Sequence, residues 1–170
     1  MKRILLILSI AVAVKLAYFS FAWICGYPVD INIFKRNDSF WYEKIATEGH
    51  AKITPDQLGS CEDDKLEQSY YAFFPLYPAV VGLTMALSGI SFATAAFLYS
   101  ILFSLSLYFL LYKFIGDISG SERIALHTTV ILILFPFHYY FSVYYTESLF
   151  LILLIAAMYC IRLNKLMLFA

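Results

Sequence analysis

Residues 4–25 read ILLILSIAVAVKLAYFSFAWIC, and this stretch decides the class of the protein. The hydrocarbon core of a bilayer is about 30 Å thick and takes about 20 helical residues to cross. The stretch has that length, and Lys15 is its only charged residue. A cleavable signal peptide has a shorter apolar core of about 7–15 residues. We therefore expect a retained first transmembrane helix, a signal anchor, with a cleaved signal peptide as the alternative.

The rest of the chain shares this apolar character. Of its 170 residues, 62% are hydrophobic and 14% charged, so the charges are too few to cover the surface of a soluble fold. Further apolar runs follow at 71–90, 92–115, 124–145 and 148–161. We expect an all-α, polytopic transmembrane helical bundle of about five membrane segments, forming one domain that is the N-terminal part of a larger one. The expected location is a bacterial plasma membrane, or the endoplasmic reticulum of a eukaryote.

Charge distribution predicts the orientation in the membrane. Lys2 and Arg3 precede the first apolar run, and positively charged flanks favour the cytoplasmic side. The polar segment 26–70 would then lie on the outer side. It carries nine acidic residues against five basic ones, which agrees with that placement.

One part of this outer loop has a helical pattern. Phe34, Asp38, Trp41 and Ile45 are spaced by four, three and four residues, as on one face of a helix, and Gly49 follows at the position of a C-terminal cap. The spacing predicts a short helix that lies at the membrane interface.

The number of apolar runs raises a problem of topology. If every run crossed the membrane, Glu147 would lie in the cytoplasm and Arg162 and Lys165 outside, against the positive-inside tendency. We therefore expect one run to be broken or re-entrant. The prolines of segment 75–78, or Pro136, are the natural places, because proline removes a backbone donor.

Charge and metal-binding residues exclude several classes of function. The formal net charge is zero, which argues against a nucleic-acid partner. Cys25, Cys61 and Cys160 lack metal-ligand spacing, and a Cys25–Cys61 disulfide remains open. His127 and His138 have no third ligand at metal spacing, so neither a metal nor a cofactor is expected.

Three polar segments could carry chemistry. Asp38 could accept a proton from an attacking hydroxyl at the membrane surface, or it could cap the helix that follows. The segment 71–78, YAFFPLYP, could simply start a helix, since proline suits a first turn. Glu147, flanked by hydroxyl side chains, suggests a functional site if it lies at membrane depth and a solvated turn if it does not.

Taken in order, these segments resemble the PIG-V-like family of membrane mannosyltransferases, which are related to the enzyme that adds the second mannose of GPI anchors. The resemblance is carried by Asp38-Ser39-Phe40-Trp41-Tyr42 with Ile45-Ala46 and Gly49, by Ala72-Phe73-Phe74-Pro75-Leu76-Tyr77-Pro78, and by Pro136 with Ser142 and Tyr145-Thr146-Glu147-Ser148. It implies the helical GT-C fold, with an active site on the lumenal or periplasmic face. Asn37 departs from the pattern, because the family usually has tryptophan there.

The resemblance also implies roles. Asp38 would be the catalytic base or the carboxylate that orients the acceptor, and mannose would come from a polyprenyl- or dolichyl-phosphate donor and pass to a lipid- or glycan-linked acceptor. From chemistry alone, Arg36 could meet the donor phosphate. The other expected substrate-binding residues are Trp41, Tyr42, Phe74, Pro75, Tyr77, Tyr145, Thr146 and Glu147.

A different class of function remains as the alternative. The chain could be a non-catalytic membrane protein, either a transporter fragment or an assembly subunit with a partner membrane subunit. In that case Glu147 and the prolines would form a substrate site at broken helices.

Overall fold

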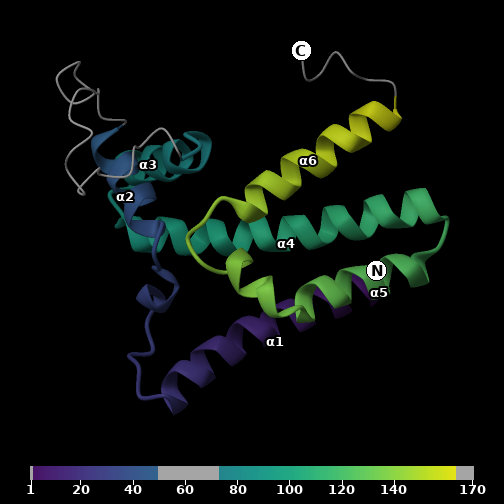
Figure 1. Ribbon diagram of the computed structural model, residues 1–170, viewed down its shortest axis with the longest axis horizontal. Helices are drawn as coiled ribbons and strands as arrows, with labels where there is room; N and C mark the ends of the chain where they lie inside the picture. Colours follow the sequence, from purple (N-terminus) through teal and green to yellow (C-terminus); the bar gives the residue numbers. More distant parts are fainter. Residues whose placement is uncertain (1, 50–72, 164–170) are drawn as a thin grey trace, which may run out of the picture.

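The computed structural model describes residues 2–49 and 73–163, and within these ranges every regular element is helical (Figure 1). The α-helices are α1 (Lys2–Ile24), α2 (Ser39–Glu48), α3 (Leu76–Ser88), α4 (Phe92–Ser119), α5 (Glu122–Leu134) and α6 (Glu147–Arg162). Two 3-10 helices are η1 (Ile31–Phe34) and η4 (Pro136–Phe141). The expected all-α fold is confirmed.

Two of the described helices, α1 and α4, are long and apolar enough to cross a membrane. They have 23 and 28 residues, or about 35 and 42 Å at 1.5 Å per residue. Helix α1 buries only Ile7, Ala11 and Ala22, so most of its apolar side chains face outward, as lipid would allow. The two helices support membrane association, whereas the expected bundle of five spans is not confirmed.

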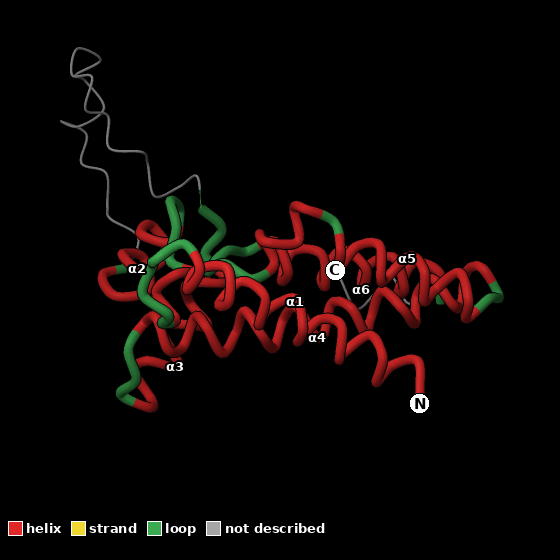
Figure 2. Tube along the Cα trace, turned by 90° about the horizontal axis from the view of Figure 1, so that it is seen from below, coloured by secondary structure: helices red, strands yellow, loops and turns green. Residues whose placement is uncertain are grey.

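At one end of the molecule, side-chain contacts join the start of α1 to the start of α5. They also join the end of α6 to Asp117, near the end of α4. Arg3 of α1 pairs with Glu122 at the start of α5. Near the end of α6, Tyr159 donates to the Asp117 carboxylate at 2.5 Å and Arg162 donates to the Asp117 carbonyl at 2.7 Å. Helices α2 and α3 lie at the opposite end in both views (Figures 1 and 2).

The apolar run that contains Pro136 is broken there, whereas Pro78 lies within the first turn of α3. Segment 124–145 is not one helix, because α5 ends at Leu134 and Pro136 opens η4. Phe135 is extended, with φ −68° and ψ 137°, as the residue before a proline prefers. In segment 71–90 the helix begins only after Pro75, and its 13 residues extend about 20 Å, less than the bilayer core.

Helix α3 packs against α2 instead, and a glycine makes the approach possible. A Cβ atom at Gly82 would lie 2.7 Å from the carbonyl oxygen of Ala46, which no real contact tolerates. The absence of a side chain at Gly82 therefore sets the distance between the two helices.

A buried polar group ties η4 to α1. Lys15 Nζ donates to Ser142 Oγ at 3.1 Å, and the Tyr18 hydroxyl is hydrogen-bonded to His138 Nδ1 at 2.9 Å. The His138 ring stacks on both Tyr18 and Tyr108, with centroids 6.0 and 5.7 Å apart. These contacts hold the broken segment in place, and the turn that leads into α6 follows directly from it.

Candidate functional site

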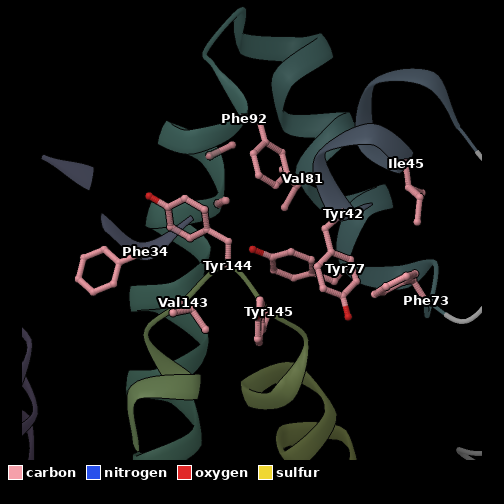
Figure 3. Packing of buried hydrophobic residues seen from close by; sticks show 12 residues of the cluster. Phe34, Tyr42, Ile45, Phe73, Tyr77, Val81, Phe92, Val143, Tyr144 and Tyr145 are labelled. Atoms are coloured by element: carbon pink, nitrogen blue, oxygen red, sulfur yellow. The ribbon is translucent and has the colours of Figure 1, made fainter. Parts of the chain in front are cut away.

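An aromatic cluster joins the three motif segments at the α2–α3 end of the molecule. Figure 3 shows Tyr42, Tyr77 and Tyr145 beside one another. The Tyr42 ring lies 5.3 Å from Tyr77, 6.3 Å from Tyr145 and 5.2 Å from Phe73, centroid to centroid. We call the buried set the site cluster; its members are Phe34, Tyr42, Ile45, Phe73, Tyr77, Val81, Phe92, Ala95, Ala96, Val143, Tyr144 and Tyr145. Segments that are remote in sequence therefore build one site.

Hydrogen bonds fix α2 to the turn before α6. The Tyr42 hydroxyl and Thr146 Oγ1 are 3.2 Å apart, and the backbone N–H of Asp38 donates to the Tyr145 hydroxyl at 3.4 Å. The two contacts lie one helical turn apart along α2. They place the Asp38 backbone against the residues that lead to Glu147.

Tyr144 anchors the same turn, and sequence reasoning did not single it out. It is fully buried. Its hydroxyl donates to the Ile31 carbonyl at 2.5 Å, its N–H donates to the Phe34 carbonyl at 3.3 Å, and its carbonyl accepts from Ser39 Oγ at 3.5 Å. Nothing local distinguishes it in a chain with 14 tyrosines, because its role depends on partners more than 100 residues away.

The carboxylate of Asp38 does not serve as a helix cap. Asp38 precedes α2, but its backbone is helical, at φ −63° and ψ −14°, and its side chain makes no capping hydrogen bond. A capping side chain normally comes from an extended residue. Ser39 Oγ instead accepts from the N–H of Arg36 at 3.1 Å. The capping interpretation is therefore wrong, and the exposed Asp38 carboxylate is left free of that role.

Glu147 is the first residue of α6 and is half-buried at the site cluster. Its Oε2 atom is buried and has no hydrogen-bond partner among the residues the structure describes. Burial raises the pKa of the Glu147 carboxyl, the charge of Asp38 raises it further, and the N–H groups of Glu147 and Thr146 oppose the shift. The charge of Asp38 thus acts on Glu147 at this site.

The Tyr77 hydroxyl is a second buried polar group without a partner in the described chain. Its ring is 1% exposed and packs on Tyr42. An unpaired buried polar group costs about 1–3 kcal/mol, so its presence calls for a compensating role. Glu147 and Tyr77 leave the site with polar atoms that a bound hydroxylated molecule could satisfy.

Comparisons with family models, with curated proteins and with solved structures find no match for the chain.

The remaining predicted residues divide into two groups. Trp41 is half-buried and stacks on Phe73, with centroids 6.0 Å apart, so it flanks the site cluster. Phe74 is 74% exposed, and Pro75 is exposed beside it. The structure does not bring these two into the buried cluster. Arg36 is exposed too, two residues before Asp38.

No three His, Cys, Asp or Glu side chains gather as a metal site needs within residues 2–49 and 73–163. Cys25 is exposed, and Cys61 lies outside the described residues. The Cys25–Cys61 disulfide therefore stays a prediction.

The raised pKa of Glu147 predicts a pH-dependent stability. Such a carboxyl binds a proton more readily when folded, so the folded state loses stability as pH rises from the ordinary value of 4.5 through the raised pKa. Glu147→Gln removes this loss. We expect the variant to unfold at a higher temperature than the wild type near neutral pH, and the gap to close below about pH 4. Thermal unfolding in detergent across this range measures it; a gap that does not change with pH would contradict the argument.

Proposed function

We propose that the chain is a lipid-dependent mannosyltransferase of the PIG-V-like kind, or the part of one that carries the catalytic carboxylate. The observation that supports this is the position of Asp38. Its exposed carboxylate is free of a capping role and lies beside an aromatic cluster that also carries Glu147. A carboxylate with aromatic surfaces and a second, protonatable carboxyl suits the binding and activation of a sugar.

In the proposed reaction Asp38 acts as the general base. The acceptor hydroxyl gives its proton to the Asp38 carboxylate while its oxygen forms a bond to C1 of the mannose. The bond from C1 to the phosphate oxygen breaks, its electron pair leaves with the lipid phosphate, and the configuration at C1 inverts. Arg36 supplies positive charge where negative charge develops on the phosphate.

The other groups of the site bind the sugar. The Glu147 carboxyl and the Tyr77 hydroxyl can hydrogen-bond to sugar hydroxyls, because their buried polar atoms have no partner in the described protein. Trp41 stacks on Phe73 and adds aromatic surface at the edge of the cluster. Tyr42 and Thr146 bond to each other, and their role is to hold α2 against the turn.

The proposed orientation puts this site on the outer side of the membrane. Lys2, Arg3, Arg123 and Arg162 belong to the end of the molecule opposite the site, where positive-inside bias predicts the cytoplasm. Helix α1 then runs outward, α4 inward, α5 with η4 outward and α6 inward, while α3 stays on the outer side. Glu147 then lies outside and Arg162 in the cytoplasm. This removes the conflict with the positive-inside tendency. In a background where serine replaces Cys25, Cys61 and Cys160, impermeant thiol reagents should modify a Phe74→Cys variant without permeabilisation; modification only after permeabilisation would refute this orientation.

The test of function is the transfer of radiolabelled mannose from polyprenyl-phosphate mannose in membranes that contain the chain, compared with membranes that lack it. Label should move to a lipid- or glycan-linked acceptor only where the chain is present. Folded protein that transfers no label, but supports solute uptake or subunit assembly that depends on Glu147, would favour the non-catalytic alternative.

A further inference from the structure

A lysine lies within α1, one of the two described helices long enough to span the membrane, and the proposed reaction does not use it. At 1.5 Å per residue, Lys15 is about 14 Å from the end of α1 at Ile24. It is half-buried, and its Nζ donates to Ser142 Oγ at 3.1 Å. No ion pair joins it to a carboxylate within the residues that the structure describes. A charged group at such a depth usually has a function.

Stability does not explain why a lysine occupies this position. A lysine inside a membrane helix costs free energy, and one hydrogen bond to a charged group returns at most about the same amount. A methionine side chain would occupy similar space without that cost. The bond from Lys15 is therefore better explained by the position that it gives to Ser142.

The end of η4 is bonded to the start of α6 as well as to α1. Ser148, which follows Glu147, donates from its Oγ to the Phe141 carbonyl at 3.4 Å. Phe141 precedes Ser142, the partner of Lys15, and both serines are buried. A displacement of Ser142 would therefore pass to the first turn of α6, where Glu147 lies.

The residue on the other side of Glu147 is held by α2. Thr146 Oγ1 is 3.2 Å from the Tyr42 hydroxyl. Glu147 is thus fixed through both of its neighbours, and one of the two attachments leads to Lys15. Burial and the charge of Asp38 raise the pKa of the Glu147 carboxyl, whereas the charge of Lys15 makes no contribution. Lys15 can therefore act on Glu147 through position, and not through its electric field.

We propose that Lys15 is a positioning residue, whose hydrogen bond to Ser142 fixes the end of η4 and thereby the place of the Glu147 carboxyl in the site. The path runs from α1 through η4 to α6. Its effect on sugar transfer rests on the proposed function, whereas its effect on the place of Glu147 does not. Binding at the outer surface then depends on a charge inside a membrane helix.

Lys15→Met has nearly the same length and removes the hydrogen bond. Mannose transfer should fall by about 10- to 100-fold, because a small misplacement of a binding group is enough for such a loss. The unfolding temperature should stay the same or rise, since no charge has to be buried. Ser20→Ala is the matched control, because Ser20 is exposed on the same helix and bonds only to the Leu16 carbonyl within it. Its transfer rate should equal that of the wild type.

Glu147→Gln tests whether the effect passes through Glu147. In this variant Lys15→Met should cause little further loss of transfer, because residues that act through one another are not additive. A second readout needs no transfer: near neutral pH, the rise in unfolding temperature caused by Glu147→Gln should be smaller in the Lys15→Met background. Both backgrounds contain the same titratable groups close to Glu147, which are Asp38, Tyr42, Tyr77 and Tyr145.

The outcomes separate the positioning role from the reaction. Folded Lys15→Met protein with the wild-type rate of transfer would overturn the role and leave the proposed function intact. Additive losses with Glu147→Gln, or loss of folded protein in Lys15→Met, would also overturn it, because the bond would then only stabilise the fold. An unchanged rise in unfolding temperature would overturn it whether or not mannose is transferred. A smaller rise, in a protein that transfers no mannose, would support the role and refute the transferase.

Discussion

Asp38→Asn is expected to lower the rate of mannose transfer by about 100-fold or more, because a positioned general base contributes about 10²–10⁴-fold. Asparagine has nearly the same size but cannot accept the acceptor proton. The Asp38 side chain is exposed and makes no capping hydrogen bond, so the temperature of unfolding should stay the same. Initial rates of transfer and thermal unfolding, measured on one preparation, give both quantities.

Glu48→Gln is the matched control for this variant. Glu48 is exposed at the opposite end of α2, and the substitution makes the same chemical change one helix length from the site. Its transfer rate should equal that of the wild type. A near-normal rate in Asp38→Asn, or an equal loss in both variants, would refute the catalytic role of Asp38.

Gly82→Ala should destabilise the fold by about 1–3 kcal/mol, which is the usual effect of overfilling a tightly packed contact. The new Cβ would lie 2.7 Å from the carbonyl oxygen of Ala46, a backbone atom that cannot rotate away. Helix α2 must therefore move off α3. The midpoint of unfolding in detergent should fall, and transfer should fall with it because α2 positions Asp38.

Gly116→Ala is the control, a glycine in the last turn of α4 where space is available. A Cβ there would lie 3.8 Å from the Cβ of Ala125, which is an ordinary contact. Alanine is the better helix former by about 1 kcal/mol, so this variant should be as stable as the wild type or slightly more stable. Equal destabilisation by both substitutions would show that the α2–α3 distance is not set by Gly82.

The sequence predicts the short helix that ends at Gly49 but misplaces its buried face. Gly49 does end α2, with φ 78°, as the pattern indicates. Phe34, however, belongs to η1, because the chain turns at Asn37, whose φ is 29°. The buried face of α2 is formed by Ser39, Tyr42 and Ile45 instead. Helical spacing alone cannot reveal a turn between two of the residues that define it.

The site could be predicted as a set of motifs, but not as an arrangement. Local sequence marked Asp38, Tyr77 and Glu147, yet it did not reveal that Tyr144 would anchor the turn between them. It also read Lys15 only as an interruption in an apolar helix, whereas the structure pairs it with Ser142, 127 residues away. These contacts depend on packing between distant segments, which helical periodicity does not encode.

The long separation between the two halves of the site has a consequence for biogenesis. The hydrogen bond from Asp38 to Tyr145 joins residues 107 positions apart. A ribosome that adds about 5–20 residues per second delivers Tyr145 roughly 5–20 s after Asp38. During that interval the apolar face of α2 has no α6 turn to cover it, and the headgroup layer of the membrane is the surface that can shelter it. We therefore expect the nascent helix to stay at the lipid interface until the turn before α6 docks onto it.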